Sequence, residues 1–245
     1  MIQDHSIEIQ HLGTDDMPAD HLSKTTTGSK YKSSLLELSK VRKSNTNVGD
    51  VYEITFSEFK SLSEFIGKLA SNEKYALSLM RMIAADLRNA SFTHFRMEYI
   101  SAPEDIKIVF KNTSSSTAGI NMYASYEITS NFAFEKYLTS ADDGTAAVFK
   151  SSMHAVSFPS NRGNMLVIPR GPYVNFYDFA SNALPEEITD FWKHVGMLMS
   201  AFDSQSESFL LASHAGSEAA QSVFHFHLRF EFRDKDAITR IKEKL

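Results

Sequence analysis

A strict alternation of apolar and polar residues near the carboxyl end constrains the fold of this chain more than any other feature. In the segment 221–230, QSVFHFHLRF, phenylalanine and leucine alternate with His225, His227 and Arg229. A period of two is typical of a β-strand, in which every second side chain lies on the same face of a sheet. We therefore expect the two histidines and the arginine to share one face, and the apolar residues to pack on the other. Three such side chains on one strand face suit a phosphate group.

Composition sets limits on the remaining possibilities. The chain has 245 residues, of which 42% are hydrophobic, which is enough for one large domain with a core. A net charge of −5 makes nucleic acid an improbable partner. The lack of cysteine excludes disulfides, thiolate metal sites and a cysteine nucleophile. No run is long enough to span a bilayer and no leader is recognisable, so we expect a cytoplasmic protein without a membrane partner.

The pattern along the chain predicts three segments. Residues 1–47 lack apolar periodicity and are rich in Ser, Thr, Lys and Asp, which predicts a flexible tail. Residues 48–129 carry helical stripes and strand-like runs, and we interpret them as an α/β N-terminal extension of unknown role. Residues 130–245 combine strands with a long helix that begins at Pro185, where proline in the first turn favours helix initiation. This order of elements predicts an α+β fold with a mainly antiparallel sheet.

The individual elements are expected as follows. In the N-terminal extension we predict helices over 56–69, with Ser57 as a cap, and over 73–89, and strands over 93–100, 105–111 and 120–128. In the remainder we predict a helix over 132–138, a hairpin of 146–149 with 154–158, strands over 164–170 and 209–213, the helix from Pro185, and a last strand through the two histidines.

Several of these strings resemble the histidine triad (HIT) superfamily of nucleotide hydrolases and nucleotidyl transferases. The segment 166–170, LVIPR, is similar to the apolar family strand that ends in Ile-Pro-Lys. The segment 221–228, QSVFHFHL, is similar to the signature Gly-Gln-Ser/Thr-Val-x-His-x-His-x-His with apolar residues at x. The resemblance covers residues 130–232 and implies a HIT-like sheet; the first 129 residues have no counterpart in the minimal family domain.

The resemblance implies a chemistry for the matching positions. The middle histidine of the triad, here His227, would attack the α-phosphorus of a nucleotide and form a nucleotidyl-histidine that water or another acceptor then takes. The first histidine, His225, would orient the segment and its hydrogen bonds. Gln221 and Ser222 match positions that hydrogen-bond phosphate oxygens or the leaving group. No cofactor is implied, the expected partner is a nucleotide or nucleotide conjugate, and small family members leave a homodimer open.

The sequence also departs from the family pattern. Arg229 stands at the third triad position, where it can clamp a phosphate but cannot donate a proton at neutral pH. Asn164 replaces a histidine that many members carry before the Leu-Val-Ile-Pro strand, and we expect it to contact substrate. His214 stands where an asparagine is expected, and we assign it as a substitute proton donor. The acid that often binds the ribose is replaced by the segment 158–160, FPS.

Other readings of these residues stay open. The two histidines are also compatible with zinc, with His214, His154 or Glu231 as a third ligand, or with purely structural roles. Arg162 and Arg170, on either side of the apolar strand, are additional candidates for phosphate contacts. As a whole, the sequence favours a hydrolase or nucleotidyltransferase that uses His227. A catalytically inactive HIT-like module that binds nucleotides or proteins is the alternative, because the third histidine and the ribose acid are missing.

Overall fold

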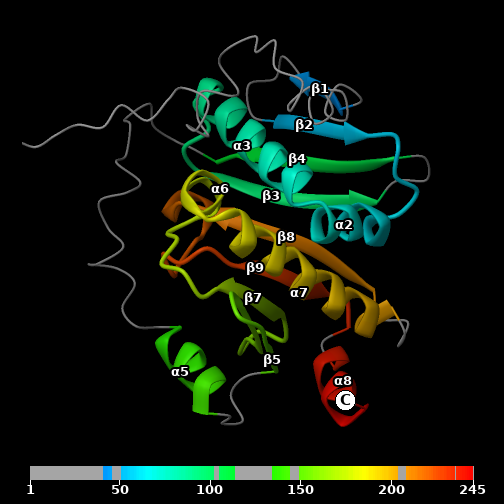
Figure 1. Ribbon diagram of the computed structural model, residues 1–245, viewed down its shortest axis with the longest axis vertical. Helices are drawn as coiled ribbons and strands as arrows, with labels where there is room; N and C mark the ends of the chain where they lie inside the picture. The colour runs from blue at the N-terminus through cyan, green and yellow to red at the C-terminus, as the bar shows by residue number, and fades with distance from the viewer. Residues whose placement is uncertain are drawn as a thin grey trace, which may run out of the picture.

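A single antiparallel sheet organises the molecule. The computed structural model describes residues 41–45, 51–101, 105–113, 134–143, 149–203, 208–234 and 236–244. Within these ranges nine strands form one sheet in the order β1-β2-β4-β3-β8-β9-β7-β6-β5, and neighbouring strands pair antiparallel (Figure 1). The strands are β1 (Val41–Asn45), β2 (Val51–Phe56), β3 (Phe95–Ser101), β4 (Ile106–Asn112), β5 (Lys150–Ser151), β6 (Ala155–Pro159), β7 (Met165–Pro169), β8 (Phe209–Ala215) and β9 (Leu228–Phe232).

Helices cover one face of this sheet. The α-helices are α2 (Leu62–Ser71), α3 (Glu73–Asn89), α5 (Glu135–Asp143), α6 (Phe176–Asn182), α7 (Pro185–Asp203) and α8 (Ala237–Lys244), and η3 (Ser217–Ala219) is a short 3-10 turn. The layer is made by α2, α3, α6 and α7, with the long helix α7 packed against both α2 and α3 (Figure 1). The apolar side of α7, which includes Phe191, Trp192 and Val195, is buried in the core. The predicted α+β fold with an antiparallel sheet and a long helix is confirmed.

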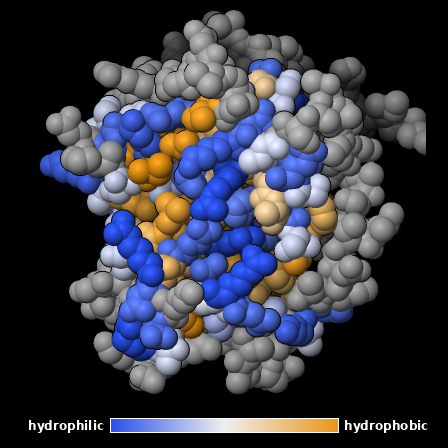
Figure 2. All heavy atoms as spheres, turned by 180° about the vertical axis from the view of Figure 1, so that it is seen from behind, coloured by the Kyte–Doolittle hydropathy of each residue, from blue (hydrophilic) through white to orange (hydrophobic). Residues whose placement is uncertain are grey.

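The opposite face of the sheet is polar over much of its area. Figure 2 shows this side, where hydrophilic residues predominate with hydrophobic ones between them. On β3, Phe95 and Met97 belong to the core, so Arg96 and Glu98 alternate onto the other face. The Arg96 guanidinium contacts Glu231 at 2.8 Å, and the Lys111 ammonium contacts Glu98 at 2.7 Å. Such partly exposed pairs contribute roughly 0–1 kcal/mol each, so they fix side chains more than they stabilise the fold.

The N-terminal extension and the C-terminal part share the sheet. Strand β3 pairs with β8 from Phe95 opposite Ala215 to Tyr99 opposite Leu211, and β8 is paired with β9 on its other side. One cluster of buried apolar residues runs through both parts. The domain boundary near residue 130 stays a prediction, and residues 1–40 of the expected tail and the strand expected over 120–128 lie outside the described residues.

The first predicted helix begins later than its apolar pattern suggested. Phe56 ends strand β2, in which buried and half-buried residues alternate, and helix α2 begins only at Leu62. The cap is Ser61 and not Ser57, because the Ser61 hydroxyl oxygen accepts a hydrogen bond of 3.1 Å from the Glu64 backbone N–H. The alternation over residues 51–56 is the sequence signal of this strand. The second helix has the predicted bounds, Glu73–Asn89.

Three boundaries in the C-terminal part also differ. Helix α5 begins at Glu135, and β5 occupies 150–151, where we had expected a hairpin turn; residues 144–148 lie outside the described ranges. Strand β9 begins at Leu228, so both histidines precede it. The reason is that the Phe226 N–H donates to the Tyr173 carbonyl oxygen at 2.6 Å, which ties this segment to the loop after β7 instead of to a neighbouring strand.

Candidate active site

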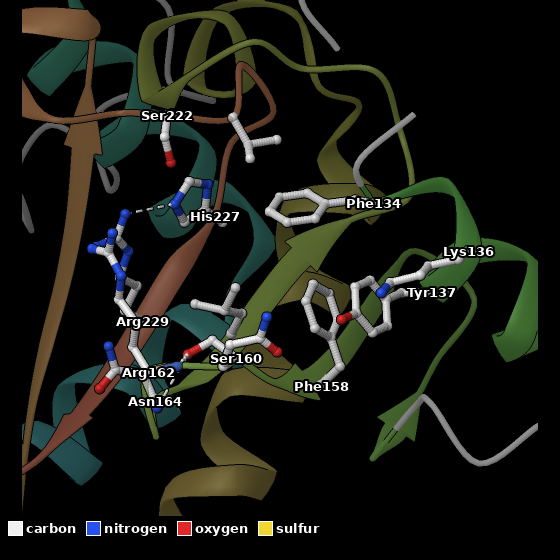
Figure 3. Close-up of a pocket in the computed structure, with 13 residues that line it drawn as sticks. Phe134, Lys136, Tyr137, Phe158, Ser160, Arg162, Asn164, Ser222, His227 and Arg229 are labelled. Atoms are coloured by element: carbon white, nitrogen blue, oxygen red, sulfur yellow. Dashed lines mark hydrogen bonds between the residues drawn. The ribbon is translucent and has the colours of Figure 1, made fainter. Parts of the chain in front are cut away.

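A pocket of about 330 Å³ lies where the segment before β9 passes strand β7 (Figure 3). It opens on the face of the sheet that the main helical layer leaves uncovered. On β7, Leu166 lines the pocket, whereas Met165 and Val167 on either side of it point to the core under the helices. Phe158 of β6 lines the pocket on the same face as Leu166. Its lining residues are Phe134, Lys136, Tyr137, Phe158, Ser160, Asn161, Arg162, Asn164, Leu166, Ser222, Val223, His227 and Arg229. One side is aromatic and the other carries two guanidinium groups.

The imidazole of His227 is held in one tautomer. Its Nδ1 lies 2.8 Å from the backbone carbonyl oxygen of His225, and because a carbonyl only accepts, Nδ1 must carry the proton. Nε2 is then the unprotonated nitrogen, and it accepts a hydrogen bond of 3.1 Å from Nη2 of Arg229. Burial, followed by the charge of Arg229, lowers the pKa of His227 to about 3. At neutral pH the ring is therefore neutral, with the lone pair of Nε2 directed to the guanidinium.

His225 anchors the segment that carries His227. Its Nε2 lies 2.8 Å from the carbonyl oxygen of Pro169, the last residue of β7, so this nitrogen is the donor. Phe134 meets both imidazoles edge-on, with ring centroids 5.8 Å from His225 and 5.6 Å from His227. Burial lowers the pKa of His225 as well. His225 does not line the pocket, and its contacts fit an orienting residue.

Gln221 holds the preceding turn together instead of facing the pocket. Its Oε1 accepts from the Gly216 N–H at 2.7 Å, and its Nε2 donates to the carbonyl oxygens of Val174 and Val223 at 2.7 and 3.1 Å. The side chain is buried and is not part of the lining. The structure thus corrects the phosphate contact that we had expected for it, because both ends of the amide are already engaged by backbone. Ser222, the next residue, is exposed and lines the pocket.

The turn that Gln221 closes also depends on glycine. Gly216 has a φ of +86°, which L side chains rarely adopt, and a Cβ at this position would come within 2.0 Å of Nδ1 of His94. The glycine therefore allows this turn to approach the His94 ring, just before β3.

His214 lies outside the pocket, which corrects the expected role as proton donor. It is on β8, and its Nε2 lies 3.1 Å from Nη1 of Arg96, so Nε2 is the acceptor. Burial, then the charges of Arg229 and Arg96, lowers the pKa of His214 to about 4. The ring is neutral at neutral pH and has no acidic proton to give. Its Nδ1 is buried without a hydrogen-bond partner among the described residues.

Of the remaining residues that the sequence singled out, three line the pocket and one binds the backbone outside it. Asn164 and Arg229 line the pocket, as does Arg162, which the sequence left as an additional candidate. Arg170 does not; its Nε donates to the Ser152 carbonyl oxygen at 3.1 Å and fastens the β5–β6 turn.

The aromatic side of the pocket was largely missed at the level of sequence. Tyr137 from α5 stacks on Phe158 from β6 with ring centroids 3.5 Å apart and an interplanar angle of 6°. Phe134 closes the same side and meets Phe158 edge-on at 5.3 Å. The available signal was the run of aromatic residues over 132–138, but only the fold brings it against Phe158, some twenty residues later in the chain.

Neither a metal centre nor a membrane span is found in the described part of the chain. Within it, no three His, Asp or Glu side chains come together as metal ligands, and no helix is long and apolar enough to cross a bilayer. Two of the third zinc ligands considered above have other contacts: the Glu231 carboxylate accepts from Arg96, and Nε2 of His214 also accepts from Arg96.

Two curated relatives are similar to part of the chain, although no family model matches it. The chain is 32% identical over 79 residues to an uncharacterized 13.2 kDa HIT-like protein of Azospirillum brasilense, a match that covers 31% of this chain and 65% of that protein. It is 28% identical over 64 residues to an uncharacterized HIT-like protein of Rickettsia prowazekii, covering 26% of this chain and 53% of that protein. Part of this chain is therefore similar to HIT-like proteins. It spans about half to two thirds of the length of these relatives.

A solved structure shows a fold likeness over a larger part of the chain. A uridylyltransferase structure superimposes with a TM-score of 0.51 at 8% identity and covers 82% of this chain and 79% of its own. Residues 130–245 make up less than half of the chain, so this likeness includes part of the N-terminal extension, for which the minimal family domain had offered no counterpart.

Proposed function

We propose that this HIT-like chain acts at the α-phosphate of a nucleotide through a nucleotidyl-histidine intermediate on His227. The observation that carries the proposal is the tautomer of His227: Nδ1 is occupied by the His225 carbonyl, and Nε2 is unprotonated at the wall of a pocket. A neutral imidazole with one unprotonated nitrogen is the form that a histidine nucleophile needs.

The reaction follows from this geometry. Nε2 attacks the α-phosphorus, a P–N bond forms, and the P–O bond to the leaving group breaks. Arg229, which binds Nε2 in the free protein, is close enough to exchange this contact for a phosphate oxygen, because a guanidinium prefers an anionic partner to a neutral nitrogen. Ser222 offers a hydroxyl at the same end of the pocket (Figure 3). Water or a second substrate then takes the nucleotidyl group and frees His227.

The aromatic side of the pocket supports a nucleotide as the ligand. Phe134, Tyr137 and Phe158 present ring surfaces next to the polar end, and bases bind to such surfaces by stacking (Figure 3). A nucleotide has an apolar base at one end and an anionic phosphate at the other, which matches this division of the pocket.

One observation favours a binding module without turnover as the second candidate. Nη2 of Arg229 already occupies the lone pair of the nucleophile at 3.1 Å. If Arg229 keeps this contact when a nucleotide binds, His227 has no lone pair to offer, and the pocket binds without reacting.

Release of nucleoside monophosphate distinguishes an enzyme that uses His227 from a binding module without turnover. Parent protein and His227→Ala are incubated with dinucleoside polyphosphates, nucleotide sugars, nucleoside triphosphates and nucleoside phosphoramidates, and the monophosphate is quantified by mass spectrometry. The proposal expects release by the parent and none by His227→Ala. His154→Ala, a half-buried histidine outside the pocket, serves as the matched control and should behave as the parent does. Nucleotide binding without release from any substrate would establish the binding module.

A further inference from the structure

The pocket lacks a group that could protonate a poor leaving group beside His227. Its lining contains no Asp, no Glu and no second histidine among the described residues. Lys136 lines the aromatic end, where its Nζ lies 4.7 Å from the centre of the Tyr137 ring. His214, the substitute expected from the sequence, binds Arg96 outside the pocket. A leaving amine or alkoxide needs a proton in the transition state, and here nothing next to the reacting nitrogen supplies it.

The same pocket carries positive charge that no carboxylate neutralises directly. Arg162 and Arg229 both line the polar side (Figure 3), and neither forms a salt bridge within the described ranges. Burial is the main cause that lowers the pKa of Arg229; the nearby charge of Glu231 raises this pKa, and the charge of Arg162 lowers it, so the two guanidiniums repel each other. The cations elsewhere on this sheet, Lys107 and Lys111, are instead paired with Glu53 and Glu98 at 2.9 and 2.7 Å.

We infer that Arg162 and Arg229 form a subsite for a second phosphate, bonded directly to the phosphate that His227 attacks. The substrates are then nucleoside diphosphate conjugates, dinucleoside polyphosphates or nucleoside triphosphates, and not phosphoramidates. This inference rests on the proposed function and narrows its substrate class. A guanidinium without a carboxylate partner is a strong, bidentate phosphate ligand, and two of them match a group that carries more than one negative charge.

The chemistry of the leaving group agrees with the missing proton donor. When Nε2 forms the bond to the α-phosphorus, the electrons of the bridging P–O bond pass to the bridging oxygen. This oxygen leaves as part of a phosphate, whose second pKa is about 6, so it is stable at neutral pH without taking up a proton. The developing charge falls on the oxygen that faces the two arginines, which stabilise it electrostatically.

Occupation of the subsite also frees the nucleophile. In the free protein Arg229 binds Nε2 of His227, and a second phosphate that draws the guanidinium away uncovers the lone pair. A ligand with one phosphate leaves more of the protein in the covered state. The arginine that replaces the third histidine thus couples reactivity to the presence of a diphosphate.

Equilibrium binding of matched ligand pairs tests the subsite. Dissociation constants are measured by titration calorimetry for AMP and ADP, and for the guanosine, uridine and cytidine pairs. We expect a diphosphate to bind at least tenfold more tightly than its monophosphate in the parent, and we expect this ratio to fall to threefold or less in Arg162→Gln. Arg162 is exposed, so its replacement leaves the fold intact. Arg233→Gln, an exposed arginine just beyond β9 and outside the pocket, is the matched control and should keep the parent ratio.

The outcomes separate this inference from the proposed function. A ratio near one in the parent, or a tenfold ratio that survives in Arg162→Gln, overturns the subsite. A covalent nucleotide on His227 together with a ratio near one would leave the proposed function standing without the subsite. A tenfold ratio that depends on Arg162, with no adduct from any diphosphate substrate, would retain the subsite but refute the intermediate. Failure to bind any nucleotide overturns both.

Discussion

The Nδ1 atom of His227 lies 2.8 Å from the carbonyl oxygen of His225, and this single contact decides which ring nitrogen faces the pocket. His225 is itself fixed, because its Nε2 donates to the Pro169 carbonyl at the end of β7. The apolar core on the other side of the segment, which includes Phe226 and Leu228, keeps both rings in place. Backbone carbonyls and core packing thereby orient the proposed nucleophile, without an acidic side chain.

Activity should be nearly independent of pH on the acid side of neutrality. Burial holds the pKa of His227 at about 3, below its usual 6.5, so the imidazole stays neutral from pH 8 down to pH 5. We expect kcat/KM, which reports ionisations of the free enzyme and free substrate, to change by less than about twofold over this range. A nucleotide sugar is the suitable substrate because it has no terminal phosphate that titrates near pH 6. An acid limb with a midpoint near 6.5 would show that His227 titrates normally and is not buried as described.

Stability should fall on acidification. The pKa values of His194 and His214 are lowered to about 4, and that of His227 to about 3, mainly by burial. Between about pH 6.5 and 4 the unfolded chain therefore binds protons that the folded protein does not, and the free energy of unfolding decreases as pH falls. Each such proton contributes up to about 1.4 kcal/mol for every pH unit. Urea unfolding at pH 7, 6 and 5 measures the slope, which should be shallower in His194→Asn than in the parent; equal slopes would contradict the burial of this ring.

Gln221 is expected to matter for stability. Gln221→Ala removes three hydrogen bonds to backbone groups, one from the Gly216 N–H and two to the carbonyl oxygens of Val174 and Val223. Losing them from a buried turn should lower the free energy of unfolding by roughly 2–4 kcal/mol. Denaturant unfolding measures the change, and Ser222→Ala, at the exposed neighbour, should stay within about 0.5 kcal/mol of the parent. An unchanged stability of Gln221→Ala with lost turnover would instead restore the phosphate contact that the family resemblance implied.

Placing a histidine at position 229 should change which leaving groups are accepted. Arg229→His places an imidazole that can donate a proton next to Nε2 of His227. General acid catalysis typically contributes 10²–10⁴-fold, so we expect turnover of nucleoside phosphoramidates to rise at least tenfold relative to nucleotide sugars. The ratio of the two kcat/KM values in parent and variant is the measurement. A ratio that does not move would mean that the leaving group is protonated by something other than the residue at position 229.

The local alternation of residues predicted which side chains of the segment 224–230 share a face, but it did not predict which backbone groups this segment is hydrogen-bonded to. The alternation placed His227 and Arg229 opposite Leu228 and Phe230, and the structure does bury the latter two in the core. That the two histidines precede β9 follows from the contact with Tyr173, which lies more than fifty residues earlier and leaves no trace in local periodicity. Helix α7 is the opposite case: its apolar residues follow the helical period because they pack as one continuous face, so the sequence predicted it.

The site was predictable where a motif supplied it and not where the fold assembles it. His227, Ser222, Asn164 and Arg229 were expected at the site and line the pocket. Gln221 and His214 were assigned by position in the motif, yet their side chains turn to backbone and to Arg96, which only the structure shows. The stacking of Tyr137 on Phe158 joins two elements whose approach no sequence spacing encodes.

The most direct test is to trap the intermediate on His227. The parent protein is mixed with a nucleotide sugar, quenched under alkaline conditions in which a P–N bond survives, and its intact mass is measured, followed by peptide mapping. We predict a mass increase of one nucleoside monophosphate, located on His227, that is absent from His227→Ala and present in the control His154→Ala. Turnover without any adduct, or an adduct that persists in His227→Ala, would contradict a nucleotidyl-histidine mechanism at this residue.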